Sequence, residues 1–398
     1  MALKNEHQQR QPKTTKALHT SEPPEVTQLI HTLVPEIIVE ILLRLPVESL
    51  LRSRSVCKLW RSIISDQHFI KSHLSFSTSN NLYALHRLIF STVPKISIKS
   101  CPLYDVLYDG SVNSLELNYP LKHSLKSVWI AGSCNGLLLI TNEDYTLFIW
   151  NPSTRRSNRL PNNGVKSRLG WHEKYGLGCY ESIDDYKVVG ISSIFRDDSD
   201  GARYDTIVNI YSLKTGNWKK TDDFHNGFPL DGSVTFLNGV FHWAASRKFG
   251  SSYSWTIVSL DLAKETYGEI LQPVYDEGDK DLTLGVVGEW LCVLCDYYKV
   301  CADVWVMKVY GVKDSWIKLV SIPYLTDPGW DQYSVPLCIS NDGKVLLQFG
   351  LKLVVYDSRN CSFSEIQKLN ECLDAFTFVE SLVYPIFLIA GAGNNNDG

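Results

Sequence analysis

Residues 34–74 read VPEIIVEILLRLPVESLLRSRSVCKLWRSIISDQHFIKSHL. The first part predicts one amphipathic helix that ends before Pro46, because apolar residues recur every three or four positions, at Val34, Ile37, Ile38, Ile41, Leu42 and Leu45. Two shorter apolar groups predict two more helices, one with Val47, Leu50 and Leu51 and one with Val56, Cys57, Trp60, Ile63 and Ile64. A module of about 40 residues rarely buries enough apolar surface to be stable alone. We therefore expect this segment to pack against the rest of the chain or against another protein.

Short motifs stand at fixed spacing in this segment: Val34-Pro35, Glu40-Ile41-Leu42, Leu45-Pro46 and Val56-Cys57-Lys58-Leu59-Trp60-Arg61. Together they resemble an F-box, with Val34 at a position where the family usually has leucine. A plainer interpretation makes these the core helices of an ordinary domain, which periodicity alone would favour. The Leu45-Pro46 break, the Cys-Lys-x-Trp-Arg placement and the strand-rich chain that follows favour the F-box.

The F-box resemblance implies a partner and a set of contact residues. An F-box over residues 29–76 docks on an SKP-type adaptor, which links it to the cullin and RING subunits of an SCF ubiquitin ligase. The residues assigned to the F-box core and the adaptor contact are Val34, Pro35, Ile38, Ile41, Leu42, Leu45, Pro46, Leu50, Leu51, Val56, Cys57 and Trp60. The sequence leaves open which of them point inward and which outward.

An apolar strand introduced by a turn recurs five times in the remaining chain, at a spacing of about 50 residues that is typical of repeat architectures. The five segments are Asn135-Gly136-LLLI, Asp184-Asp185-YKVVGI, Asn238-Gly239-VFHWA, Gly288-Glu289-WLCVLC and Asp342-Gly343-KVLLQF. Their turn residues tolerate the positive φ that tight hairpins require. A second alternating strand follows each one, as in LFIWNPSTRR from Leu147 and IVSLDLAKET from Ile257. Each repeat thus supplies three or four antiparallel strands.

These repeats predict an antiparallel β-propeller-like domain of about five or six units over residues 77–390. Segments between residues 80 and 126 supply one more divergent unit, and the C-terminal FTFVESLVYPIFLIA adds a strand that closes the ring and removes exposed edges. The alternative is a large twisted β-sandwich, since no unit carries a WD or double-glycine kelch signature. The fold class is α+β and mainly β, with the small α-helical F-box first.

Several repeat segments, including GSCNGLLLI, FIWNPSTRR, NGVFHWAA and FVESLVYP, resemble the F-box-associated domain of plant F-box proteins, among them S-locus F-box and kelch-like members. In that family the C-terminal domain recruits the protein to be ubiquitinated. The resemblance implies a non-catalytic substrate receptor that directs a target to ubiquitination and proteasomal degradation. No kelch motif is preserved, so a kelch label would be an analogy.

Charge and hydropathy limit the expected cellular location of the protein and the classes of partner that it can bind. The formal net charge of −4 is spread along the chain without a basic stripe, which disfavours nucleic-acid binding. No apolar run reaches the length of a membrane span, and residues 1–28 form a polar tail without the apolar core of a signal peptide. We expect disorder in that tail and flexibility in residues 391–398. The expected location is the cytoplasm or the nucleus, without membrane insertion.

The ten cysteines suggest disulfides by their even number, but a chain without a secretory signal favours reduced and buried thiols. Cys292 and Cys295 form the closest pair. They fall in an apolar strand where their odd separation points the two thiols to opposite faces, which disfavours a zinc site. No metal and no cofactor are predicted.

Catalytic signatures such as Gly-x-Ser-x-Gly, a Gly-rich phosphate loop or His-Glu-x-x-His do not occur in the sequence. The pair Asp184-Asp185 is interpreted as a hairpin turn, and His242 as a core residue of a strand. The sequence leaves open whether folding brings Ser, His and Asp side chains together into a catalytic triad. For the turn 150–156, Arg155 and Arg156 either face a substrate or lie solvated beyond a type I turn.

Target contacts are expected on loops between strands, at residues 162–174, 196–204, 247–254 and 275–281. The candidate side chains are Arg168, Trp171, Arg196, Arg203, Arg247, Tyr253 and Tyr275. The identity of the target is left open by the sequence. An alternative function is a propeller outside any ligase that binds another protein, a glycan or a small ligand in a cavity walled by Trp and Tyr.

Overall fold

The computed structural model describes residues 34–79, 83, 85–93, 97–110, 112–122, 127–165, 171–180, 184–198, 201–222, 224, 227–230, 232–246, 255–298, 300–324, 332–366, 369 and 371–385. For residues 171, 180, 197–198 and 201–203 it describes the backbone alone. The predicted tails at residues 1–28 and 391–398 lie outside the described residues. The chain divides into two compact units, residues 1–42 and residues 43–398.

Helix α2 (Pro35–Leu43) supplies the described part of the first unit. It begins at Pro35, where a fixed φ suits the first helical position and the missing N–H costs nothing. Ile38 and Leu42, one turn apart, are buried. The helix ends at Leu43, two residues earlier than the apolar spacing predicts, and Leu45 lies beyond it.

Three further helices open the second unit: α3 (Val47–Ser53), α4 (Lys58–Ser65) and α5 (Gln67–Thr78). The Cys57 thiol caps α4 by accepting a hydrogen bond from the Trp60 backbone N–H at 3.4 Å. The Asp66 carboxylate caps α5 by accepting from the N–H groups of His68 and Phe69 at 2.9 and 3.1 Å. The sequence-based interpretation did not separate α5 as a helix, although an Asp before a helical run is a start signal.

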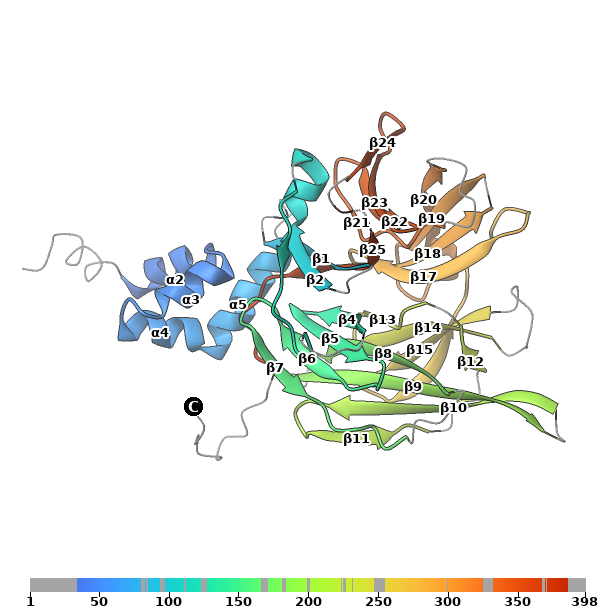
Figure 1. The fold of residues 1–398 in the computed structure, drawn as a ribbon, viewed down its shortest axis with the longest axis horizontal. Helices are drawn as coiled ribbons and strands as arrows, with labels where there is room; N and C mark the ends of the chain where they lie inside the picture. The colour runs from blue at the N-terminus through green and yellow to red at the C-terminus, as the bar shows by residue number, and fades with distance from the viewer. Residues whose placement is uncertain are drawn as a thin grey trace, which may run out of the picture. The chain divides into compact units, whose positions relative to one another are not determined.

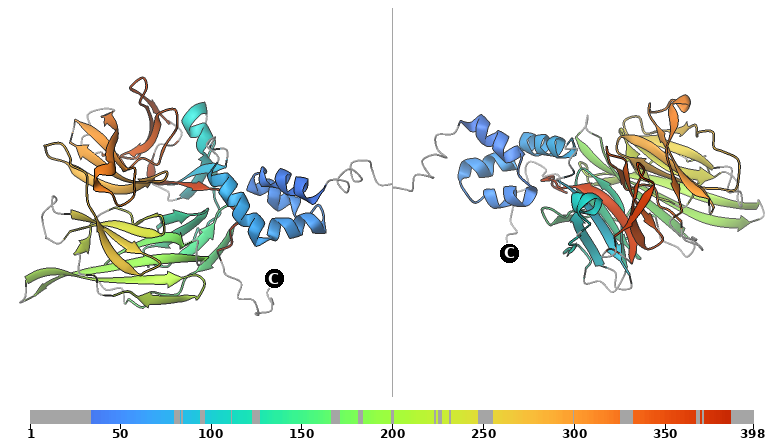
Figure 2. Two further views of the ribbon diagram at one scale, coloured as in Figure 1. Left: turned by 180° about the vertical axis from the view of Figure 1, so that it is seen from behind. Right: turned by 90° about the horizontal axis from the view of Figure 1, so that it is seen from above.

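Six antiparallel sheets form the rest of the second unit, and they build a six-bladed β-propeller (Figures 1 and 2). The first blade along the chain holds β4 (Val128–Cys134), β5 (Leu137–Asn142), β6 (Phe148–Asn151) and β7 (Arg156–Arg159). The second holds β8 (Trp171–Tyr180), β9 (Asp185–Asp198), β10 (Gly201–Ser212) and β11 (Asn217–Lys220). The third holds β13 (Thr235–Leu237), β14 (Val240–Ser246), β15 (Trp255–Asp261) and β16 (Thr266–Ile270), with β12 (Phe228–Pro229) paired to β14. The fourth holds β17 (Asp281–Val287), β18 (Trp290–Tyr297), β19 (Cys301–Met307) and β20 (Trp316–Pro323). The fifth holds β21 (Cys338–Ile339), β22 (Lys344–Phe349), β23 (Lys352–Asp357) and β24 (Ser362–Glu365).

The sixth blade closes the ring with strands from both ends of the propeller sequence. Its order is β25 (Cys372–Val379), β1 (His86–Thr92), β2 (Ser97–Pro102) and β3 (Leu115–Glu116), and a short π-helix, η1 (Asp105–Asp109), follows β2. Figure 1 shows red β25 beside cyan β1, and the register pairs His86 with Val379. The predicted divergent unit and closing strand are confirmed, the blade count is six, and the β-sandwich alternative is excluded.

Tight turns between the first and second strands of the blades follow the predicted chemistry. Asn135 and Gly136 have φ of 52° and 78°, and Asn238 and Gly239 have 52° and 80°, the pattern of a two-residue hairpin with both residues left-handed. At Gly136 a side chain is also excluded by space, because a Cβ there would lie 2.3 Å from the Ser381 hydroxyl oxygen. The turn therefore requires glycine for both conformation and close packing.

Large apolar side chains fill the spaces between neighbouring blades. Trp243 and Phe241 on β14 lie in one cluster with Val189 and Ile191 on β9, and all four are at most 1% exposed. Trp150 on β6 lies in another cluster that includes Phe378 of the closing strand. The stability of the propeller therefore rests on apolar contacts between blades.

The two faces of the propeller differ in the connections that they carry. We call turn face the one with the turns between first and second strands, at residues 135–136, 238–239, 288–289 and 340–343. We call crossover face the opposite one, with the loops between second and third strands and the connections between blades, including residues 143–147, 160–165, 271–280, 298 and 300. Because blades repeat around one axis, corresponding loops of all blades lie on the same face.

Within the second unit, helix α5 reaches the propeller on the turn face. Helix α5 precedes β1, and the first residue of β1 pairs with the last residue of β25 at that face. Within the second unit, Lys71 of α5 forms an ion pair with Asp184 at 2.8 Å, and Asp184 stands just before β9 in a first-to-second strand connection. Arg54 donates a hydrogen bond to the Tyr384 hydroxyl at 3.0 Å. The crossover face is thus turned away from the point where α5 joins the propeller.

Candidate interaction surfaces

Helix α2 presents large apolar side chains to solvent. Val34, just before the helix, is 55% exposed, and Ile37 and Ile41 are each 46% exposed. Ile38 and Leu42 lie on the buried side of the same helix. A stripe of exposed apolar residues on a short helix is typical of a surface that binds another protein.

The start of α4 presents a second exposed apolar pair. Val56 is 53% exposed and Leu59 is 48% exposed, whereas Ile64 near the end of the same helix is fully buried. The Cys57 cap between them fixes the first turn, so both side chains are held by ordered backbone. Trp60 is half-buried beside them in sequence.

The structure sorts the twelve residues that the sequence assigned to the F-box core and adaptor contact. Buried side chains are Ile38, Leu42 and Leu50; half-buried ones are Leu45, Leu51, Cys57 and Trp60; exposed ones are Val34, Pro35, Ile41, Pro46 and Val56. Ile37 and Leu59 are equally exposed and were not among the twelve, although both lie within the apolar motif segments. Their helical spacing from Ile41 and Val56 was the signal that would have found them.

Buried His73 of α5 contacts the backbone of the loop that holds Leu45. Its Nε2 lies 3.0 Å from the Leu45 carbonyl oxygen, and burial lowers the pKa of the imidazole. This contact supports the backbone just before Pro46. The backbone at Leu45 and Pro46 is therefore held by its contact with α5 and is not a free loop.

Those loop-based target candidates that the structure describes fall on the crossover face, but several of them lie on strands. Trp171 begins β8, Arg196 lies on β9 and Arg203 lies on β10, so the expected loops at 162–174 and 196–204 are corrected to strand ends there. The β9–β10 ladder continues to Asp198 and Gly201 because Arg196 pairs with Asp205 across it and Phe195 packs on Tyr204. The side chains of Trp171 and Arg203 lie outside the described residues.

The remaining target candidates are Arg168, Arg247, Tyr253 and Tyr275. Arg168, Arg247 and Tyr253 lie outside the described residues. Tyr275 lies on the connection before β17, where its ring meets Trp305 edge-on at 6.2 Å and its hydroxyl donates to the Gln272 side chain at 3.2 Å. Burial raises the pKa of the Tyr275 hydroxyl. Tyr275 is thus a packed residue of the crossover face and not a freely exposed contact.

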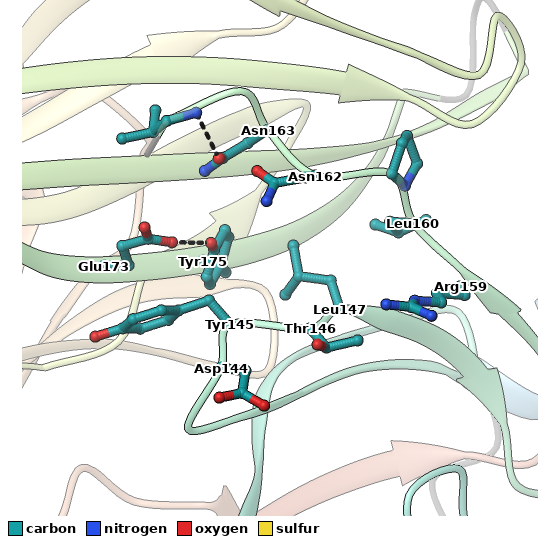
Figure 3. Close-up of a pocket in the computed structure, with 12 residues that line it drawn as sticks. Asp144, Tyr145, Thr146, Leu147, Arg159, Leu160, Asn162, Asn163, Glu173 and Tyr175 are labelled. Carbon is teal, nitrogen blue, oxygen red and sulfur yellow. Dashed lines mark hydrogen bonds between the residues drawn. The ribbon is translucent and has the colours of Figure 1, made fainter. Parts of the chain in front are cut away.

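A small pocket opens on the crossover face between the first and second blades (Figure 3). Its volume is about 90 Å³. It is lined by the β5–β6 loop, the connection after β7 and the start of β8, through Asp144, Tyr145, Thr146, Leu147, Arg159, Leu160, Pro161, Asn162, Asn163, Val165, Glu173 and Tyr175. The loop expected at residues 162–174 covers part of this lining, but none of these side chains was predicted as a contact.

Glu173 is the desolvated acid of this pocket. Its carboxylate accepts a hydrogen bond from the Tyr175 hydroxyl, and burial raises the pKa of the Glu173 carboxyl despite that bond. Burial and the nearby Glu173 charge raise the pKa of the Tyr175 hydroxyl in turn. Such a carboxylate is stabilised by a cation close to it.

The groups that suggested chemistry in the sequence have structural partners. Asp185 of β9 is buried and accepts from the Ser212 hydroxyl at 2.7 Å and the Lys214 N–H at 2.9 Å. His242 is buried in β14, with Nε2 2.7 Å from the Tyr310 hydroxyl. Asn151 accepts from the N–H groups of Ser153 and Thr154, which organises the turn before Arg155. These contacts agree with the structural interpretation of each motif.

Cys292 and Cys295 are buried on β18 as free thiols, and burial raises the pKa of the Cys295 thiol to about 11. Within the described ranges, no group of three or more His, Cys, Asp or Glu side chains could hold a metal ion. None of the helices in the described part of the chain is both long and apolar enough to cross a membrane.

Short helices with exposed apolar residues, joined to a six-bladed propeller with a distinct loop face, define a class of modular protein-binding proteins. Comparison with known protein families defines this class of protein more specifically. An F-box domain matches residues 30–72, and an F-box associated beta propeller domain matches residues 92–384. The chain belongs to the family of F-box proteins that carry an F-box-associated propeller, and both resemblances expected from the sequence are confirmed.

Curated relatives in Arabidopsis thaliana extend along most of the chain. An F-box/kelch-repeat protein is 32% identical over 358 residues, covering 87% of this chain and 94% of the relative. The F-box protein CPR1 is 31% identical over 372 residues, covering 86% of this chain and 87% of that protein. The two domains and these relatives support the role of an SCF substrate adaptor.

Proposed function

We propose that this chain is the substrate-recruiting subunit of an SCF-type cullin-RING ubiquitin ligase. The F-box binds an SKP-type adaptor, and the adaptor connects the chain to the cullin and RING subunits. The crossover face of the propeller binds a target protein, which is then ubiquitinated and degraded. The observation that carries this proposal is that the F-box match at residues 30–72 coincides with helices that expose Ile37, Ile41, Val56 and Leu59.

Catalysis in such an assembly is catalysis by proximity. A ligase brings a charged conjugating enzyme close to a lysine of the bound target and so raises its effective concentration. The chain supplies binding and orientation, and no side chain of it reacts. We place the complex in the cytoplasm or the nucleus, where ubiquitin ligases of this kind act.

The alternative of a ligand-binding propeller gains no support from the pocket described above. Pockets for drug-sized ligands measure about 300–1,000 Å³. The pocket at Glu173 measures about 90 Å³, which is too small for a sugar ring with its hydroxyl groups. A single side chain fits it better.

The proposal is tested by a matched pair of substitutions at exposed valines. Val56→Asp places a charge on the proposed adaptor contact, and Val274→Asp places the same charge at a 77% exposed position on the crossover face. Truncating or charging a central contact costs about 2 kcal/mol or more of binding, so the Val56 variant should retain less than about a tenth of the co-purified adaptor. The Val274 variant should retain all of it.

Ile41→Asp, on α2, is a second variant with the same expected loss. Circular dichroism and the thermal midpoint of each variant establish that it is folded. Undiminished adaptor binding by folded Val56→Asp and Ile41→Asp variants would contradict the proposed docking surface.

A further inference from the structure

The pocket on the crossover face contains a carboxylate, Glu173, that has no counter-charge among the residues that the structure describes. Among the described residues, Glu173 accepts one hydrogen bond, from Tyr175, and has no ion-pair partner. Burial raises its pKa, which is the signature of a carboxylate that has lost water without gaining a cation. A positive group from outside the chain would restore that missing interaction.

The other charged residues leave the Glu173 end of the pocket acidic. Asp144 on the β5–β6 loop also lines the pocket, and among the described residues of its lining Arg159 is the one cationic side chain. Figure 3 shows Arg159 at the opposite side of the pocket from Glu173. A ligand cation at Glu173 would therefore lie at the side of the pocket away from the lining arginine.

The walls beside Glu173 suit an alkyl stem that ends in a cation. The rings of Tyr145 and Tyr175 lie next to the carboxylate, and Leu147 and Leu160 line the pocket further along (Figure 3). Aromatic faces attract cations, and the aliphatic parts of lysine and arginine pack well on apolar surfaces. A bare metal ion or a small anion would gain nothing from these walls.

The pocket is held in shape by its own loop. The Asn142 side-chain oxygen accepts from the N–H groups of Asp144 at 3.1 Å and Thr146 at 3.0 Å, and Asn142 is itself buried. The Tyr145 N–H donates to the Asn142 carbonyl oxygen at 2.8 Å. A preformed site loses little conformational entropy when a ligand enters.

Asn163 adds a feature that favours a polypeptide over a free cation. Its side-chain oxygen accepts from the Val165 N–H at 3.0 Å, while its side-chain nitrogen is buried and has no acceptor among the described residues. A buried donor without an acceptor is unfavourable. A main-chain carbonyl of a bound segment would supply the acceptor next to the same pocket.

We propose that this pocket receives a lysine or arginine side chain of the target protein, with Glu173 binding the cation. The volume of about 90 Å³ admits one side chain and not a larger ligand. This inference rests on the proposed function, because it assigns one recognition position on the face that we propose for target binding. It narrows the target to a protein with an exposed basic side chain in the recognised segment.

The test uses the full chain purified with an SKP-type adaptor and an array of random ten-residue peptides in matched pairs. The two members of a pair differ at one position, lysine against norleucine or arginine against citrulline. For binding sequences, the basic member should bind about tenfold more tightly or better, as expected for a charged hydrogen bond in a desolvated site. Glu173→Gln, which keeps an acceptor for Tyr175, should remove this preference.

Glu277→Gln is the matched control, because Glu277 is an exposed acid on the 271–280 connection of the same face. It should keep the full preference, and both variants should keep the wild-type thermal midpoint. No preference in the wild type, or an unchanged preference in Glu173→Gln, would overturn the inference.

Adaptor co-purification, read from the same samples, separates the two proposals. If the adaptor is present but basic peptides are not preferred, the pocket inference fails and the ligase role stands. If the adaptor is absent but the Glu173-dependent preference is present, the pocket inference stands and the ligase role fails.

Discussion

The helical segment and the propeller use apolar residues in opposite ways. Around α4 the helical segment leaves Val56 and Leu59 about half exposed, whereas the propeller buries Trp150, Phe241 and Trp243 almost completely. Apolar surface that stays in water contributes nothing to folding until a partner covers it. This difference in burial predicts that substitutions in the propeller core lower stability, while substitutions of the exposed helical residues lower binding to a partner.

The largest expected effect is at Trp243, in the cluster between the second and third blades. Trp243→Ala should lower the free energy of unfolding by about 3–5 kcal/mol, because it removes a buried aromatic side chain and leaves a cavity. Chemical denaturation of the full chain measures this loss. Leu271→Ala, at a position 61% exposed on the crossover face, is the control and should change stability by less than about 0.5 kcal/mol.

At temperatures where the Trp243→Ala variant is still folded, its binding to the adaptor should equal that of the wild type. A loss of stability below about 1 kcal/mol would contradict the role given to the inter-blade core.

Gly136 connects the turn face to the closing strand, and it allows the cost of crowding to be separated from the cost of backbone strain. Gly136→Ala should destabilise the propeller by about 2–3 kcal/mol, because a Cβ would meet Ser381 and the Val379 carbonyl oxygen at a φ of +78°. Gly216 has a similar φ of +72° with open space around it. Gly216→Ala should cost about 1 kcal/mol, and equal thermal midpoints for the two variants would refute the close contact with the closing strand.

His242 gives the propeller core a pH dependence. Burial lowers its pKa from 6.5 to about 3 in the folded protein. Between these values the unfolded chain binds one more proton than the folded protein, so the free energy of unfolding falls as pH falls, by up to about 1.4 kcal/mol per pH unit. Burial lowers the pKa of His73 as well, with the same sign.

The measurement is chemical denaturation at several pH values from 6.5 down to 4.5. His242→Gln should show a smaller loss of stability over this range than the wild type, while His68→Gln, at an exposed position, should follow the wild type. Parallel curves for the wild type and His242→Gln would show that burial of this imidazole does not govern the slope.

Local sequence signals predicted much of the propeller. Asn-Gly turns and alternating strands mark the blades because hairpins are short-range structures whose turn residues need positive φ. The closing strand was predicted from the apolar C-terminal run, since an open ring would leave edges exposed. Helix α5 was missed although Asp66 is a start signal, because the polar residues 65–68 interrupt the apolar pattern that predicts the preceding helix.

Features that depend on distant residues could not be predicted in the same way. The β9–β10 ladder extends into residues assigned to a loop because Arg196 pairs with Asp205 and the tilted rings of Phe195 and Tyr204 pack across it. The Glu173 pocket exists only where the β5–β6 loop meets the connection after β7 and the start of β8. No sequence pattern within one of these three segments predicts that they come together in space.

The central claim is that the exposed apolar residues of the helical segment bind an SKP-type adaptor. Light scattering coupled to size-exclusion chromatography, on the full chain co-expressed with that adaptor, tests it most directly. The two proteins should elute as a single one-to-one complex, with the chain's 45.1 kDa added to the mass of the adaptor. A stable 45.1 kDa monomer that elutes apart from the adaptor would contradict it.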